Sequence, residues 1–122
     1  MILIIGGAYQ GKLDYAQATY DLRAEDTYQC TSSEIDFSKR CIYAIEEFVW
    51  EYDGEDPRDY FRSHREQWQN SILICRDLSC GVVPMGAENR AWRQKTGRLC
   101  QYLAGEAEQV IRIFCGLEQR LK

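Results

Sequence analysis

The sequence predicts an α/β fold with a small, mainly parallel sheet flanked by helices. Short apolar runs at residues 2–5, 72–75 and 109–115 are typical of buried strands. Stretches with helical periodicity separate these runs along the chain. Strands and helices that alternate in this way favour a parallel sheet with short crossovers. A length of 122 residues suits one domain, covering residues 1–122.

The most informative motif directly follows the first apolar run. Residues 6–12 have the pattern Gly-x4-Gly-Lys, which is typical of a phosphate-binding loop, or P-loop. Glycines let backbone N–H groups approach a phosphate, and the N-terminal end of the next helix attracts an anion. A strand before the loop and a helix after it favour a P-loop NTPase-like fold over an ordinary glycine-rich turn. The residues expected at a bound nucleotide are Gly6, Gly7, Ala8, Tyr9, Gln10, Gly11, Lys12 and Leu13.

Two residues of this loop predict its chemistry. We expect Lys12 to reach the β- and γ-phosphates of ATP or GTP as a positive charge and to act in catalysis. The next position normally carries Ser or Thr, whose hydroxyl binds Mg²⁺. Leu13 cannot supply that oxygen, so dependence on Mg²⁺ should be weak.

Asp77 is the acidic residue with the most informative position in the chain. It follows the apolar run at residues 72–75. An acid at the carboxyl end of a strand beside the P-loop strand would face the nucleotide and its Mg²⁺. Asp77 is therefore the expected metal ligand and a second catalytic residue. The alternative is an aspartate that only caps the end of the strand.

The remaining elements follow from periodicity and from breaker residues. Apolar residues spaced three to four apart predict helices at residues 13–23, 37–52, 59–69 and 87–107. A short strand is expected at residues 27–30. Glycine and proline predict a solvated acidic turn within residues 46–59 and a loop at residues 79–86.

The stretch at residues 59–69 mixes aromatic side chains with Arg62 and Arg65. Such a mixture can stack on nucleobases. A helix that packs its aromatic side on the core, with arginines that balance the acidic turn, explains the pattern more simply. His64, the only histidine, lies in this stretch. We interpret it as an exposed helix residue, and the alternative is a catalytic base or covalent acceptor.

Composition argues against several other classes of protein. A net charge of −4 and a pI near 5.0 give no general attraction to nucleic acid or to anionic membranes. No stretch approaches the ~20 apolar residues that span a bilayer, and the first apolar run is too short for a signal peptide. We therefore expect a cytoplasmic protein. The six cysteines are expected to be buried free thiols, and one histidine leaves little to complete a metal site.

Several short segments, in order, resemble one known family. They are residues 4–8 with Gly11-Lys12, residues 80–84, Arg90-x2-Arg93-x3-Gly97-Arg98 with Leu103-Ala104, and Cys115-Gly116 before Leu121-Lys122. This set is similar to the adenosylcobinamide kinase / adenosylcobinamide-phosphate guanylyltransferase family of cobalamin biosynthesis. The resemblance covers residues 1–13 and about 71–122, whereas residues 28–69 differ and are shorter than in full-length members.

The resemblance implies a P-loop protein that binds ATP or GTP and phosphorylates a hydroxyl of adenosylcobinamide. It then implies transfer of GMP through a histidine-bound intermediate. Arg90, Arg93 and Arg98 would lie near the nucleotide or the corrinoid phosphate. The acceptor histidine has no counterpart in residues 35–47, and His64 lies too far along the chain to replace it.

Three functions are compatible with these residues. The first is a compact kinase of this type, without secure guanylyl transfer. The second is a catalytically silent nucleotide-binding homologue with a regulatory or accessory role, which Leu13 and the absent histidine favour. The third is a structural or interaction protein, against which Lys12, Asp77 and the arginines argue. The sequence does not decide between ATP and GTP, the acceptor, or whether the chain forms a homo-oligomer.

Overall fold

The fold is a six-stranded sheet with helices on both faces, seen in a computed structural model that describes residues 1–78 and 86–122. The strand order is β2-β3-β4-β1-β5-β6. In chain order, the elements of the described residues are β1 (Ile2–Gly6), α1 (Lys12–Tyr20), the 3₁₀ helix η1 (Ala24–Asp26), β2 (Thr27–Gln29), β3 (Cys41–Tyr43), α2 (Ile45–Glu51), α3 (Pro57–Ser63), α4 (Arg65–Trp68), β4 (Ile72–Arg76), α5 (Ala87–Glu106), β5 (Gln109–Phe114) and β6 (Leu117–Arg120).

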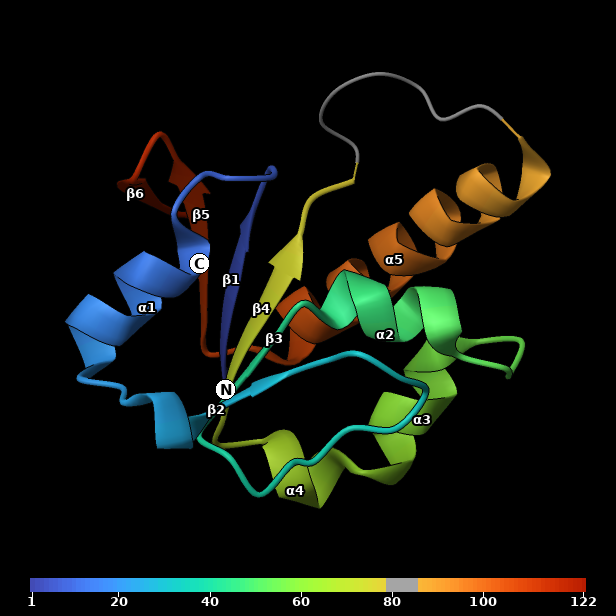
Figure 1. Ribbon diagram of the computed structural model, residues 1–122, viewed down its shortest axis with the longest axis horizontal. Helices are drawn as coiled ribbons and strands as arrows, with labels where there is room; N and C mark the ends of the chain where they lie inside the picture. Colours follow the sequence, from blue (N-terminus) through green and yellow to red (C-terminus); the bar gives the residue numbers. More distant parts are fainter. Residues whose placement is uncertain (79–85) are drawn as a thin grey trace.

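The sheet is mainly parallel, as the sequence predicts. β1 lies between β4 and β5 and is parallel to both, with Ile2 opposite Ile72 on one side and Gln109 on the other. β3 and β2 continue the parallel sheet beyond β4, and only β6 runs antiparallel, against β5. The carboxyl ends of the five parallel strands therefore lie at one edge of the sheet, and β1 and β4 point to the top of Figure 1.

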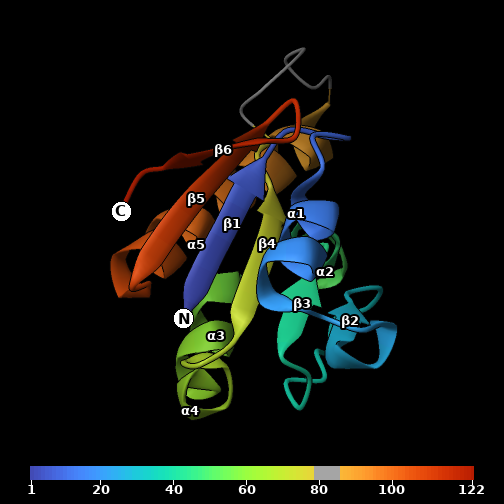
Figure 2. The same cartoon turned by 90° about the vertical axis from the view of Figure 1, so that its left-hand side faces the viewer.

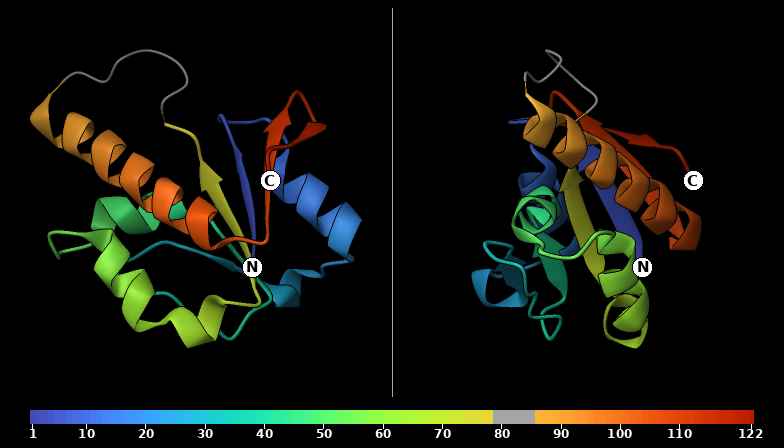
Figure 3. Two further views of the ribbon diagram at one scale, coloured as in Figure 1. Left: turned by 180° about the vertical axis from the view of Figure 1, so that it is seen from behind. Right: turned by 90° about the vertical axis from the view of Figure 1, so that its right-hand side faces the viewer.

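Apolar side chains cover both faces of the sheet because helices lie on both sides of it. Leu3 faces the helices α2 to α5, and the adjacent Ile4 faces α1. The same alternation in β4 sends Leu73 to the larger core and Ile74 to the smaller one. Figure 1 shows α1 alone on one side, and Figure 3 shows α5 crossing the opposite face of the sheet.

Two predicted helices differ from the structure. The expected helix at residues 37–52 is wrong in its first half, because residues 41–43 form β3 and only residues 45–51 form α2. The predicted helix at residues 59–69 is two helices, α3 and α4, which meet at His64. α3 also begins earlier than expected, because the Asp56 side chain accepts a hydrogen bond from the Arg58 backbone N–H and Pro57 fits the first turn.

The C-terminal segment confirms one expected strand and adds another. β5 covers residues 109–114, close to the predicted 109–115, and the long helix α5 also matches its prediction. β6 has no counterpart among the predictions, since all four of its residues are exposed and show no apolar alternation. The expected loop at residues 79–86 lies, apart from Gly86, outside the described residues.

The described cysteines are free thiols, and three of them are buried as predicted. Cys30, Cys41 and Cys75 lie in the core, Cys100 is half-buried and Cys115 is exposed. Cys80 lies outside the described residues. Within the part of the chain that the structure describes, no helix combines the length and apolar character that crossing a membrane requires.

Candidate functional site

The candidate site lies at the carboxyl edge of the parallel sheet. Gly6 ends β1 opposite Arg76 at the end of β4, and the predicted P-loop continues from Gly6 to the start of α1. In Figure 2 the arrowheads of β1, β4 and β5 point to this edge. Open α/β sheets bind their ligands at the carboxyl ends of the strands.

Close contacts and backbone conformation explain two glycines of the loop. A Cβ atom on Gly6 would lie 2.6 Å from the carbonyl oxygen of Ile113, so no side chain fits there. Gly11 has φ +89°, in the left-handed region that glycine adopts without strain. Tyr9 has φ 59° and a fully exposed side chain. The loop therefore makes a tight turn over the end of β1 before α1 begins.

The loop is attached to the turn between β5 and β6. The carbonyl oxygen of Gln10 accepts a hydrogen bond of 3.0 Å from the Gly116 N–H, and its side-chain oxygen accepts one from the Cys115 N–H. On the other side, the Tyr15 hydroxyl of α1 donates to the Glu118 carboxylate of β6. The C-terminal hairpin thus supports both the loop and the helix that follows it.

Lys12 lines a pocket of about 570 Å³ with the ends of β2, β3 and β4 around it. Its ammonium donates a hydrogen bond of 2.7 Å to the carbonyl oxygen of Gly7 within the loop. Burial lowers the pKa of Lys12 below its usual 10.5, while the charge of Glu46 acts in the opposite direction. A cation that bonds to its own loop can exchange that carbonyl for a phosphate oxygen.

Glu46 is an acidic residue of this pocket that the sequence did not indicate. Its carboxylate accepts a hydrogen bond of 2.9 Å from the Arg76 N–H, and it lines the pocket beside Lys12. A sharp turn places it there, because Ala44 adopts φ 59° and ψ 39° between β3 and α2. The sequence predicts a continuous helix at residues 37–52 without such a turn and assigns Glu46 to the solvated acidic stretch. Because the sequence does not predict β3, it does not place Glu46 in the pocket.

Asp77 and the three predicted arginines of α5 lie together, but around a different cavity. This cavity of about 1010 Å³ lies between the carboxyl ends of β1 and β4 and the N-terminal half of α5. Asp77 enters its wall directly after β4, where its N–H donates to the Gly6 carbonyl over 2.7 Å. The arginines of the cavity are Arg76, Arg90, Arg93 and Arg98. Arg76 also lines the Lys12 pocket, so it borders both spaces.

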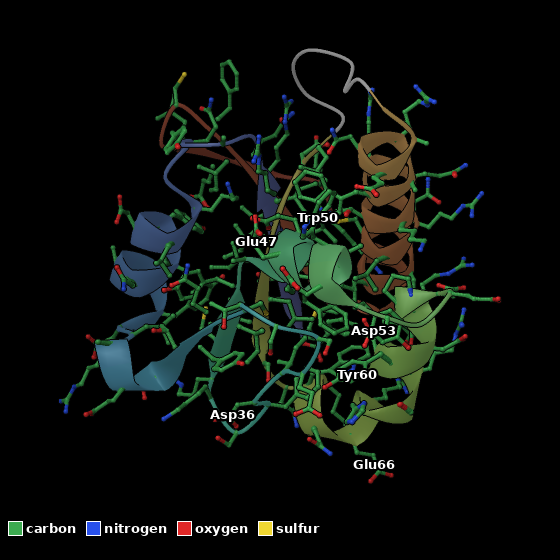
Figure 4. All side chains as sticks on the ribbon, turned by 45° about the vertical axis from the view of Figure 1, so that its right-hand side comes forward. Asp36, Glu47, Trp50, Asp53, Tyr60 and Glu66 are labelled. Atoms are coloured by element: carbon green, nitrogen blue, oxygen red, sulfur yellow. The ribbon has the colours of Figure 1, made fainter. Side chains whose placement is uncertain are left out.

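His64 lies at the opposite edge of the sheet. It joins α3 to α4, and α4 leads to the amino end of β4. Its Nδ1 lies 2.7 Å from the Tyr60 carbonyl oxygen, and its ring packs 4.3 Å from the Tyr60 ring. Figure 4 shows Tyr60 below α2, away from the phosphate loop at the top of the sheet. The structure does not bring His64 to the candidate site.

Carboxylate oxygens at this edge of the sheet can bind Mg²⁺, whereas the side chain at the start of α1 cannot. Leu13 is partly buried against the core beneath α1 and offers no oxygen. Asp77 and Glu46 supply carboxylate oxygens, the ligands that Mg²⁺ prefers. Within residues 1–78 and 86–122 there is no cluster of three or more His, Cys, Asp or Glu side chains able to hold a metal by themselves. An ion here would therefore also need oxygens from phosphate and water.

The fold and this edge of the sheet define an α/β protein with a P-loop NTPase-like architecture. The family model for cobinamide kinase / cobinamide phosphate guanyltransferase matches residues 52–121. The chain belongs to this family, a group of kinases and transferases of cobalamin biosynthesis that use ATP or GTP. The finding confirms the resemblance seen in the sequence. The matched residues include Asp77 and the arginines of α5 but not residues 6–12. No curated protein shows a significant match to the chain.

Proposed function

We propose that residues 1–122 are one nucleotide-binding domain that binds ATP or GTP and transfers a phosphoryl group to a corrinoid hydroxyl. The observation that carries the proposal is the loop of residues 6–12, which ends in Lys12 at the carboxyl edge of the sheet. Family membership supports the choice of a corrinoid as the acceptor. A phosphate loop and a corrinoid family together favour a kinase over a structural protein.

Backbone N–H groups and a few charged side chains would perform the reaction. Phosphoryl transfer depends mostly on positioning and on neutralising charge, so a small fold with few catalytic groups can support it. Backbone N–H groups of the loop and the first turn of α1 would hold the phosphates. Lys12 would leave the Gly7 carbonyl for the β- and γ-phosphates. Asp77 would hold Mg²⁺, which supplies further positive charge to the phosphates when bound.

A silent nucleotide-binding homologue is the second candidate, favoured by Leu13. Without a hydroxyl at this position, the chain lacks one of the oxygens that normally hold Mg²⁺ in a P-loop. Such a protein would bind nucleotide and regulate or assist the pathway without turnover. The two candidates share the binding step and differ in the transfer step.

Calorimetry with ATP and with GTP tests the shared step. We expect one nucleotide to bind the wild-type protein and Lys12→Ala to weaken that binding at least tenfold, because the variant removes a charge-assisted contact. Lys95→Ala is the matched control, because it removes a lysine of α5, away from the loop. No heat with either nucleotide, or equal affinity in Lys12→Ala, would refute the proposal. Phosphate transfer from labelled ATP or GTP to cobinamide then separates the kinase from the silent homologue.

A further inference from the structure

The edge of the sheet at β6 carries backbone hydrogen-bonding groups that no described strand uses. Among the described strands β6 pairs only with β5, and residues 117–121 are all exposed. Figure 2 shows β6 beyond β5, at the end of the sheet. A free edge is a template for pairing with another chain, so proteins often protect it with proline or with charges of one kind. Residues 117–121 contain no proline and carry one charge of each sign.

The register with β5 shows which backbone groups are free. The Leu121 N–H donates a hydrogen bond of 2.8 Å to the Val110 carbonyl, so the backbone of Leu121 faces β5. Residues of an antiparallel strand alternate between those that bond to the neighbouring strand and those that do not. Gln119 therefore also faces β5. The N–H and C=O groups of Glu118 and Arg120 point away from the sheet.

The sequence of this edge is complementary to itself in the antiparallel direction. Residues 117–121 are Leu-Glu-Gln-Arg-Leu. A second copy that pairs with Gln119 opposite its own counterpart would place Glu118 opposite Arg120. The same register would place Leu117 opposite Leu121. The two residues with free backbone groups would then bond to each other, as an antiparallel pair requires.

The charged side chains of β6 share one face of the sheet. Glu118 and Arg120 lie opposite Ile113 and Ile111, which belong to the core beneath α1. The Tyr15 hydroxyl of α1 donates to the Glu118 carboxylate, which places that carboxylate on the same face. None of the ion pairs among residues 1–78 and 86–122 involves either charge of β6. Opposite charges directly across an antiparallel pair are favourable, so each charge would find its partner on the second copy.

The other face of β6 carries exposed apolar side chains. Leu117 and Leu121 are 72% and 53% exposed. Phe114, which lies opposite Leu117 on β5, is 57% exposed. The proposed register would pack Leu117 of one copy against Leu121 of the other and remove apolar surface from water.

We propose that β6 is an interface between two copies of this chain, which pair antiparallel around a twofold axis at Gln119. The two sheets would join into one continuous sheet, with α1 of both copies on the same face. A contact made by residues 117–121 of each copy is small, so the dimer should be weak and should form at high protein concentration. Both copies use the same edge in such an interface, so the assembly closes at two copies.

Analytical ultracentrifugation over a range of protein concentrations tests the assembly. We expect the wild type to show an equilibrium between monomer and dimer. Arg120→Glu would place like charges opposite each other on both sides of the axis, and it should weaken dimerisation at least tenfold. Lys95→Glu is the matched control, because it reverses a charge on α5, outside the interface, and it should dimerise like the wild type.

A mixture of two variants tests the pairing of Glu118 with Arg120. Glu118→Arg, like Arg120→Glu, should be monomeric when it is alone. In an equal mixture of the two proteins each altered position would face the opposite charge, so dimers should form again. Circular dichroism establishes that both variants are folded before they are mixed.

A cysteine at the axis tests the register independently of charge. The Cα atoms of opposed residues that share no hydrogen bonds lie ~4.5 Å apart, which is within the reach of a disulfide. Gln119→Cys should therefore form a disulfide-linked dimer on mild oxidation with diamide. The background is Cys115→Ser, which removes the exposed thiol of the β5–β6 turn. Adding Arg120→Glu should suppress the cross-link.

Several results would overturn the proposal. One is a wild type that stays monomeric at every concentration, and another is a trimer or a larger assembly, because a twofold contact closes at two copies. Dimers that persist in Arg120→Glu, folded variants that stay monomeric when mixed, or the absence of a cross-link in Gln119→Cys would also overturn it. The measurements use neither nucleotide nor corrinoid, so their failure would leave the proposed function untouched.

Discussion

At the scale of single residues, the negative charge of Glu46 near Lys12 should influence how nucleotide binding depends on pH. Lys12 must be protonated to attract phosphate, and burial already lowers its pKa. The negative charge of Glu46 opposes that shift. Glu46→Gln should therefore lower the pKa of Lys12 further, so that nucleotide affinity falls at a lower pH than in the wild type. Nucleotide affinities measured from neutral to alkaline pH show the change.

Glu47→Gln is the matched control for this prediction. Glu47 follows Glu46 on α2 and lines the same pocket, but it is not among the charges that shift the pKa of Lys12. Its variant should keep the alkaline limit of the wild type. If both variants lose nucleotide at the same pH as the wild type, then Glu46 does not act on Lys12 as the structure indicates.

Leu13→Ser tests the missing hydroxyl of the loop. The serine should strengthen the dependence of nucleotide binding on Mg²⁺, because it restores the oxygen found at this position in other P-loops. Leu13 is only partly buried against the core under α1, so the loss of packing should cost no more than about 2 kcal/mol. Titration with Mg²⁺ and chemical denaturation measure the two effects. Leu13→Ala loses the same packing without a hydroxyl, and equal Mg²⁺ dependence in both variants would contradict the prediction.

At the scale of elements, the C-terminal hairpin should hold the phosphate loop in its binding conformation. Gln10→Ala removes the side-chain hydrogen bond to the Cys115 N–H at the β5–β6 turn. We expect it to lower the free energy of unfolding by about 1 kcal/mol. It should also weaken nucleotide binding several-fold, because a looser loop must be ordered when the phosphate binds. Calorimetry and denaturation measure both effects.

Gln119→Ala provides the comparison for the hairpin. Gln119 is exposed on β6 and pairs with Arg112 of β5 through its backbone, which the substitution leaves in place. Stability and nucleotide affinity should stay at wild-type values. A Gln10→Ala protein that is less stable but binds nucleotide normally would show that the hairpin supports the fold without positioning the loop.

The elements that the sequence missed were too short to show their own periodicity. Ile42, Ile45, Phe48 and Val49 all face one core, with spacings that a helix would give. Ile42 reaches that core from β3, and the other three reach it from α2. β3 has three residues, of which two pair with β4, so no alternation is visible in the sequence. The largely apolar runs of β1, β4 and β5 have no competing pattern, and the structure confirms all three strands.

At the scale of the whole molecule, the sequence could predict the edge of the sheet but not the two spaces at that edge. Parallel strands place Lys12 and Asp77 at their carboxyl ends, and both lie there. Which pocket each residue lines depends on the helices that pack on the two faces of the sheet. No local sequence pattern predicts that packing. The part played by Arg76, which borders both spaces, likewise follows only from the assembled sheet.

The same topology predicts that guanylyl transfer through a histidine is absent even if kinase activity is present. β4 has five residues, about 16 Å at the rise of a strand, and separates His64 at one edge from the phosphate loop at the other. A covalent GMP–enzyme needs a nucleophile beside the α-phosphate. His64 instead packs on Phe37 and Tyr60 below α2.

Incubation with α-labelled GTP, followed by analysis of acid-labile and acid-stable adducts, measures this transfer. We expect no acid-labile label on the wild-type protein, because the lone histidine cannot reach a phosphate bound at Lys12. His64→Ala is the control, and it should be indistinguishable from the wild type in nucleotide affinity. An acid-labile label that disappears in His64→Ala would show that α3 and α4 carry His64 to the nucleotide in a conformation other than this one, since the sheet itself keeps the two edges apart.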